Sequence, residues 1–148
     1  MGNICRSPMA EGLLRHKLRA AGLSAQIRVD SAGTGGWHAG MPPDPRAVQV
    51  CREQGIAIDD LRARQFVARD LEAFDLVLCA DRSNLRQVQA LTSSSSRARA
   101  ALLLAWAGHG ADAEVPDPWG GTLEDFRKVF GLLDSATHTM LTKLQLPA

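Results

Sequence analysis

The segment from Phe74 to Ala80 is almost continuously apolar, and a polar segment from about Arg82 to Leu91 follows it. A short apolar run of this kind is typical of a strand that is buried in a parallel sheet. Consecutive parallel strands are joined by crossover helices, and helical patterns occur on both sides of this run. The sequence therefore predicts an α/β domain with a parallel sheet.

The first helix is predicted to open at Ser7-Pro8, because serine is a preferred N-cap and proline fits the first helical position. Gly22 is a typical helix stop. The buried stripe of this helix is predicted from three leucines at helical spacing, Leu13, Leu14 and Leu18.

Two later helices have similar signals. Asp44-Pro45 starts a helix that is predicted to run to Gly55. Thr122 and Asp125 resemble a capping box, and the residues from Leu123 to about Leu144 are predicted to form the closing amphipathic helix.

The remaining segments are shorter. Gln26 to Asp30 alternates polar and apolar residues as a short strand does, whereas Ala101 to Trp106 fits either a helix or a buried strand. The low-complexity stretch from Thr92 to Ser96 is predicted to be a solvated loop within the domain. Gly-rich or Pro-rich loops follow at Ala32 to Gly40 and Gly108 to Gly121, and loops of such length often carry function.

The composition limits the range of functions. A chain of 148 residues that is 45% hydrophobic suits one domain, residues 1–148, with a real core. Its 17 basic and 16 acidic residues almost balance, so no global charge favours nucleic acid or a membrane surface. Three cysteines without a CxxC pair fit reduced thiols, and we expect a cytoplasmic protein.

The residues that most clearly carry chemistry come directly before the first helix: Gly2, Asn3, Ile4, Cys5, Arg6 and Ser7. Backbone N–H groups at a helix N-terminus point outward, and the helix dipole favours an anion there. The guanidinium of Arg6 adds a planar fork of donors that fits two oxygens of a phosphoryl group. This stretch therefore predicts a phosphate-binding loop, while a capped helix with an exposed arginine is the simpler alternative.

The order of several motifs resembles the low-molecular-weight phosphotyrosine protein phosphatases. In that family a strand ends in Cys-x-Gly-Asn-x-Cys-Arg-Ser-Pro, and this chain has Gly2 to Pro8 in the same order and spacing. Further motifs that resemble the family follow along the chain: Asp30-Ser31-Ala32-Gly33-Thr34, Trp37, Gly40, Pro42 to Ala47, Ala63-Arg64-Gln65, Asp81-Arg82-Ser83-Asn84 and Pro116-Asp117-Pro118. The resemblance implies a three-layer, Rossmann-like or flavodoxin-like fold with a small parallel sheet flanked by helices.

The resemblance also implies roles for single residues. Arg6 would bind the phosphate, and Asp117 would be the general acid and then the general base. Asn3 and Ser7 would brace the phosphate-binding loop. Trp37 and Trp119 would form walls around the phenyl ring of a substrate, although core packing is the alternative for both tryptophans.

Three features depart from the family pattern. The nucleophilic cysteine would precede Met1, and Cys5 matches the second cysteine of the loop instead, a supporting or redox-protective thiol. The strand that leads to the nucleophile would also precede Met1, so we expect this chain to be an N-terminally truncated form with very poor turnover. Leu61 occupies a position where many members have a histidine that contacts the loop asparagine.

Other functions stay open at this level. Arsenate reductases share the fold and the loop, and Cys79 is near the position of their second redox cysteine, but no cysteine follows it. A non-catalytic module could bind phosphate or phosphotyrosine through Arg6 and the loop amides without any nucleophile that attacks. A third possibility is a dimer in which another chain completes the sheet.

The expected ligands follow from these alternatives. A phosphotyrosine protein or a small aryl phosphate is the expected substrate, and inorganic phosphate or sulfate would fit the loop. The resemblance implies no metal or organic cofactor, and the four histidines, His16, His38, His109 and His138, do not have metal-ligand spacing.

Overall fold

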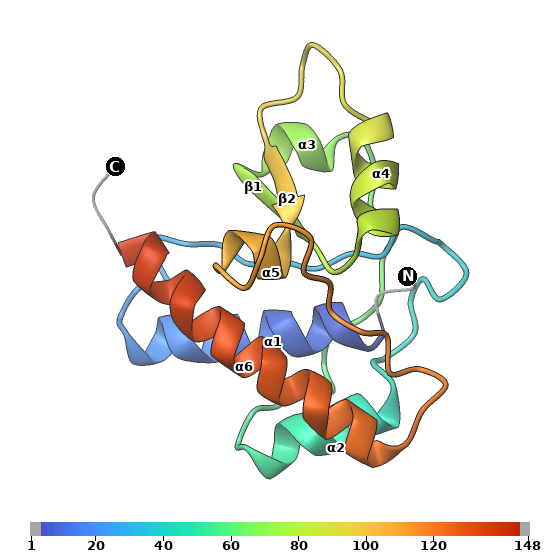
Figure 1. The fold of residues 1–148 in the computed structure, drawn as a ribbon, viewed down its shortest axis with the longest axis vertical. Helices are drawn as coiled ribbons and strands as arrows, with labels where there is room; N and C mark the ends of the chain where they lie inside the picture. The colour runs from blue at the N-terminus through green and yellow to red at the C-terminus, as the bar shows by residue number, and fades with distance from the viewer. Residues whose placement is uncertain (1–3, 146–148) are drawn as a thin grey trace.

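The computed structural model describes residues 4–145 of the chain. Gly2 and Asn3 therefore lie outside the described residues. Figure 1 shows the arrangement of the helices and strands, which in chain order are α1 (Arg6–Ala20), α2 (Pro45–Glu53), α3 (Asp70–Ala73), β1 (Leu76–Cys79), α4 (Arg82–Ala90), β2 (Arg99–Leu102), α5 (Leu103–Trp106) and α6 (Leu123–Gln145).

The sheet within the described residues consists of β1 and β2, which are parallel and in register from Leu76 beside Arg99 to Cys79 beside Leu102. Helix α4 is the crossover between them and packs against both strands. The predicted strand at Phe74 to Ala80 is thus confirmed, and so is the parallel α/β class. Within β1, however, Cys79 alone is fully buried and the other residues are half-buried.

Apolar side chains form two clusters on opposite sides of this sheet. The larger cluster joins α1, α2, α5 and α6, which lie below the sheet in Figure 1. The smaller one joins the sheet to α3 and α4 through Leu71, Cys79 and Val88. The sheet therefore lies between two helical layers. None of the helices described for residues 4–145 is long and apolar enough to span a membrane.

The helix boundaries agree with the sequence signals except at the start of the first helix. Helix α1 begins at Arg6, and Cys5 occupies the N-cap position, so the prediction that Ser7 caps this helix is wrong. The Asp44 carboxylate accepts a hydrogen bond from the Arg46 N–H, as predicted for a cap of α2. At α6, the Thr122 N–H donates to the Asp125 carboxylate and the Asp125 N–H donates to the Thr122 hydroxyl, which confirms the capping box.

Two other predictions need correction. Residues 26–30 do not form a strand, because a strand requires a ladder partner and no described strand pairs with this segment. The nearby pairing is an isolated parallel bridge between Gly33 and Gln65. The ambiguous segment from Ala101 to Trp106 contains both alternatives, since β2 ends at Leu102 and α5 begins at the next residue.

The interior of the larger cluster depends on the packing of α1 against α6. Leu13, Leu14 and Leu18 are buried as predicted, and Leu133 on α6 is equally enclosed. At the edge of this interface the Lys17 ammonium binds the Asp134 carboxylate at 2.8 Å and donates to its carbonyl oxygen. Burial of the leucines, not this exposed ion pair, supplies most of the stabilisation.

We predict that Leu13→Ala lowers the free energy of unfolding by about 2–5 kcal/mol, because it removes buried methyl groups and leaves a cavity between the helices. Urea denaturation followed by circular dichroism measures the change. Leu91→Ala is a matched control at a 40% exposed leucine, and we expect it to change stability by less than about 0.5 kcal/mol. Equal losses in both variants would contradict this description of the core.

Candidate functional site

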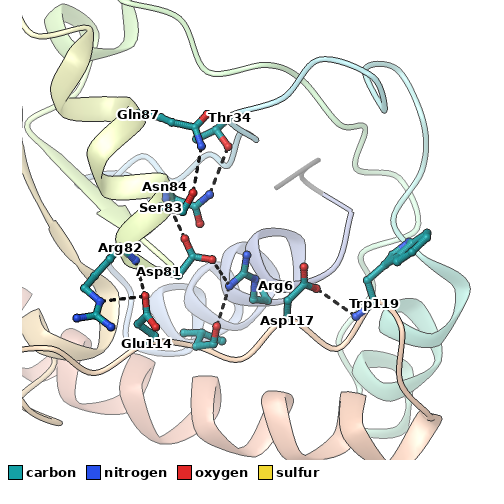
Figure 2. A network of polar contacts seen from close by, with 11 residues as sticks. Arg6, Thr34, Asp81, Arg82, Ser83, Asn84, Gln87, Glu114, Asp117 and Trp119 are labelled. Atoms are coloured by element: carbon teal, nitrogen blue, oxygen red, sulfur yellow. Dashed lines mark hydrogen bonds and ion pairs between the residues drawn. The ribbon is translucent and has the colours of Figure 1, made fainter.

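Arg6 is the most constrained charged residue of the predicted site. It is only 5% exposed. Its Nη1 atom donates to the Asp81 carboxylate at 2.9 Å and to the Val115 carbonyl oxygen at 2.7 Å (Figure 2). The exposed arginine that was the simpler sequence-based alternative is therefore wrong. Removal of the Asp81 partner would leave a buried guanidinium without its counter-ion, which is costly.

Asp81 performs two tasks with its two carboxylate oxygens. Oδ2 accepts from Arg6, and Oδ1 accepts from the Asn84 N–H at 2.8 Å as the N-cap of α4. Burial raises the pKa of Asp81, but the hydrogen bonds from Asn84 and Arg6 outweigh it and hold the pKa below its ordinary value. The carboxylate is therefore charged at neutral pH and fixes the direction of Arg6.

Asp117 lies in the exposed loop between α5 and α6. Its carboxylate accepts a hydrogen bond from the Trp119 N–H at 3.1 Å. Two residues before Asp117, the Val115 N–H donates to the Ala80 carbonyl oxygen, while the Val115 carbonyl accepts from Arg6. Figure 2 shows Arg6 between Asp81 and the loop that carries Asp117. The two residues predicted to be catalytic thus belong to one network.

The described part of the predicted phosphate-binding loop contains Ile4, Cys5 and Ser7. Ile4 and Cys5 are buried and Ser7 is half-buried at the first turn of α1. The Ile4 carbonyl accepts a hydrogen bond from the Asp44 N–H at 2.7 Å, which attaches this loop to the start of α2. The predicted roles of Gly2 and Asn3 fall on residues outside the described part of the chain.

The two tryptophans predicted to line a substrate pocket are exposed. Trp37 is 65% exposed and Trp119 is 56% exposed, so the alternative in which they pack in the core is wrong for both. Both residues contribute to the lining of the same cavity as Arg6 and Asp117. Indole rings at such positions can contact a flat aromatic group and still remain in water before it binds.

This cavity is large and partly open, with a volume of about 740 Å³. Its lining includes segment 26–34, the strand β1 and the first turns of α1. Many of the lining side chains are apolar, including Ala10, Leu14, Val77 and Leu103. The half-buried state of β1 follows from this geometry, because the edge that does not pair with β2 borders the cavity.

The whole sequence can now be placed among known proteins. Residues 1–147 match the profile of the family described as low molecular weight phosphotyrosine protein phosphatase. This chain belongs to that family. The expected family, and the small parallel sheet flanked by helices that it implies, are therefore confirmed.

Three relatives illustrate the similarity. The low molecular weight phosphotyrosine protein phosphatase of Schizosaccharomyces pombe is 41% identical over 85% of this chain and 81% of its own length. The low molecular weight protein-tyrosine-phosphatase YfkJ of Bacillus subtilis is 34% identical over 98% of this chain and 92% of its own length. A crystal structure of the protein tyrosine phosphatase from Entamoeba histolytica, with Hepes in the active site, superimposes with a TM-score of 0.90 at 28% identity, covering 98% of this chain and 92% of that one.

The three cysteines are buried, and the pKa of each thiol is raised. Burial, together with the nearby Asp44 and Asp117 carboxylates, raises the pKa of the Cys5 thiol to about 12. Burial alone raises the pKa of Cys51 to about 12, and burial with Asp81 does so for Cys79. A thiolate is the reactive form of cysteine, so none of these thiols is activated at neutral pH.

Sequence reasoning missed the two residues that organise the site most directly. Asp81 was part of a family motif but received no role, although it fixes Arg6. Arg46 likewise received none, although it contacts the loop that carries Asp117. An acidic residue directly after a buried strand, at the end where helix α4 begins, is the signal that could have identified Asp81.

We predict that iodoacetamide at pH 7.5 alkylates none of the three cysteines at an appreciable rate in the native protein, since pKa values of about 12 leave almost no thiolate. Because these values are raised, reactivity should grow only as the pH approaches 12, provided that the fold persists. Mass spectrometry of tryptic peptides measures the rate, with urea-denatured protein as the control. Rapid modification of Cys5 at pH 7.5 would show that its thiol is accessible and activated.

Proposed function

We propose that this protein is a protein-tyrosine phosphatase that hydrolyses phosphotyrosine or related aryl phosphates through a cysteinyl-phosphate intermediate. The observation that carries the proposal is the placement of Arg6, fixed by Asp81, on one cavity with Asp117 and two exposed tryptophans. Membership of the phosphatase family supports the same activity.

The roles follow from the chemistry of phosphoryl transfer. The Arg6 guanidinium and the backbone N–H groups at the start of α1 would bind the phosphoryl oxygens and stabilise their charge in the transition state. As the sulfur–phosphorus bond forms and the bond to the phenol oxygen breaks, Asp117 would protonate the leaving oxygen. The Asp117 carboxylate would then take a proton from water, which attacks phosphorus and releases the thiolate.

The nucleophile is the part of this mechanism that residues 4–145 do not provide. The three thiols are buried and unactivated, and Cys5 lies beside two carboxylates that oppose a thiolate. We propose that the catalytic cysteine belongs to a segment preceding Met1, which enters the cavity as a strand between residues 26–34 and β1. The apolar lining supports this placement, as does the edge of β1 with which no strand of residues 4–145 pairs.

The proposal also covers the domain organisation, the ligands and the cellular compartment. We propose that residues 1–148 act as a single domain, that the partners are phosphotyrosine proteins or small aryl phosphates, and that inorganic phosphate or sulfate binds in the loop. Three free thiols and no disulfide in the described residues support a reducing compartment such as the cytoplasm. The buried Cys79, with its raised pKa, gives no support to arsenate reduction.

The decisive test compares p-nitrophenyl phosphate hydrolysis by residues 1–148 with hydrolysis by a protein extended upstream to include a strand that ends in Cys-x before Gly2. We expect turnover only in the extended protein, because it alone has an activated thiol. Replacement of the added cysteine by serine serves as the control and should abolish turnover. Equal, substantial activity in both proteins would contradict the proposed nucleophile.

In the extended protein, we predict that Asp117→Ala lowers the rate by about 10²–10⁴-fold, the usual contribution of a general acid–base residue. Asp112→Ala is a matched control, because Asp112 is an exposed acid in the same loop. Stopped assays with a phosphotyrosine peptide at several pH values would measure the effect. A rate unaffected by Asp117→Ala would remove this residue from the mechanism.

One alternative has an observation in its favour: residues 4–145 contain the anion-binding arginine but no activated thiol, as a non-catalytic phosphate-binding module would. Both functions predict that Arg6→Ala weakens the binding of inorganic phosphate on the order of tenfold or more, since a charge-assisted contact is lost. Calorimetry measures the affinity, with Arg19→Ala as a charge-matched control on the exposed end of α1 and circular dichroism as the check on folding. If the extended protein also fails to turn over substrate while phosphate binding depends on Arg6, the module is the correct function.

A further inference from the structure

The loop that carries Asp117 is exposed, yet a general acid must be held close to one position to be effective. A misplacement of about 1 Å can cost on the order of 10²-fold in rate. On the N-terminal side of Asp117, the loop is fixed by the contacts of Val115 with Ala80 and Arg6. Within the loop, Asp117 itself accepts from the Trp119 N–H, and the Gly121 N–H donates to the Pro118 carbonyl oxygen. The contacts on the C-terminal side of Asp117 therefore determine how precisely its carboxylate is placed.

Arg46 on α2 performs this task with both terminal nitrogens of its guanidinium. Nη2 donates to the Trp119 carbonyl oxygen at 2.8 Å, and Nη1 donates to the Gly121 carbonyl oxygen at 2.7 Å. The Trp119 residue is thus held on both sides, by Asp117 at its N–H and by Arg46 at its carbonyl. Two hydrogen bonds from one rigid fork define a direction as well as a distance.

The guanidinium is itself held in place by two further groups. Its Nε donates to Asp44 Oδ1 at 3.0 Å, and its Nη2 donates to Asp44 Oδ2 at 2.9 Å. Its central carbon lies 4.4 Å from the centre of the ring of Phe126, which is fully buried. Burial raises the pKa of Asp44, but the hydrogen bonds from Arg46 outweigh it and hold the pKa below its ordinary value. The pair is therefore ionised at neutral pH.

Asp44 connects this arrangement to the other half of the site. Its backbone N–H donates to the Ile4 carbonyl oxygen at 2.7 Å, directly before Cys5 and Arg6. A continuous series of contacts thus runs from the phosphate-binding loop through Asp44 and Arg46 to the loop of Asp117. This series adds a second connection between the two halves of the site to the hydrogen bond from Arg6 to the Val115 carbonyl.

From these contacts we infer that Arg46 is a positioning residue for the general acid: by holding the Trp119 and Gly121 carbonyls, it sets the position of Asp117 relative to the bound phosphoryl group. Arg46 does not touch the reacting atoms in this role. The inference rests on the proposed phosphatase function, because it assigns a purpose to the same site.

The first test uses residues 1–148 and needs no activity. We expect Arg46→Gln to increase hydrogen exchange of the Trp119 and Gly121 amides on the order of tenfold, because the loop loses the contacts that hold it. Two-dimensional NMR measures exchange at each amide. Arg127→Gln is a matched control, since Arg127 pairs with Glu53 across α2 and α6 at 2.8 Å and donates to no carbonyl of this loop in the described structure. Unchanged exchange in Arg46→Gln, or an equal increase in both variants, would overturn the inference.

The second test uses the extended, active protein and aryl phosphates of different leaving groups. A misplaced acid matters most when the leaving phenol is weakly acidic and needs a proton, as tyrosine with its pKa of about 10 does. We expect Arg46→Gln to lower kcat/KM for phosphotyrosine on the order of tenfold more than for p-nitrophenyl phosphate, whose phenol is more acidic. Arg46→Lys should recover part of the loss, and Arg127→Gln should leave the ratio unchanged.

A double-mutant cycle separates positioning from general destabilisation. If Arg46 acts through Asp117, Arg46→Gln should have almost no further effect on kcat/KM in an Asp117→Ala background. Additive losses, or equal losses for both substrates, would overturn the inference. An extended protein without any turnover would instead refute the proposed function, while the exchange experiment would still decide whether Arg46 fixes the loop.

Discussion

The buried ion pair between Arg6 and Asp81 is the interaction on which the rest of the site depends. Arg6 opens α1, Asp81 caps α4 after β1, and the Val115 carbonyl that shares the guanidinium belongs to the acid-bearing loop. Three segments that are far apart in the sequence therefore meet at one charged group. A buried guanidinium needs all of its partners, because each donor that loses a partner is left in a medium that solvates charge poorly.

The contacts that anchor Arg6 have a chemical advantage for the phosphate binding that we propose. The hydrogen bonds to Asp81 and Val115 use one terminal nitrogen, so the direction of the fork is set before any substrate arrives. Less conformational entropy is then lost when a phosphoryl group binds. The same principle applies on the other side, where Asp44 and Phe126 orient the guanidinium of Arg46. Two arginines that are each held by a carboxylate thus differ in their proposed tasks: Arg6 would bind a ligand, whereas Arg46 holds backbone carbonyls.

Local signals in the sequence predicted the fold well. The capping residues Asp44 and Thr122 mark helix starts that the structure confirms, and the apolar run before Asp81 is a parallel strand. Strand formation at residues 26–30 could not be predicted correctly, because alternation describes a side-chain pattern and says nothing about whether a ladder partner is present. For the site, Arg6 and Asp117 were predicted from the motif, and both line one cavity. Asp81 has a local signal in its place after a buried strand, but its contact with Arg6 and the contact of Arg46 with Trp119 join distant segments that no local pattern pairs.

The packing of α1 against α6 also has a consequence for how the chain is made. These helices are the first and the last of the described residues, so the core that joins them closes a loop of almost the entire sequence. Closing so long a loop costs entropy before the buried leucines repay it, and such non-local contacts slow folding. During synthesis, α1 emerges from the ribosome well before its partner has been translated. The apolar face that α1 turns toward α6 must therefore remain without this cover until α6 has also emerged from the ribosome.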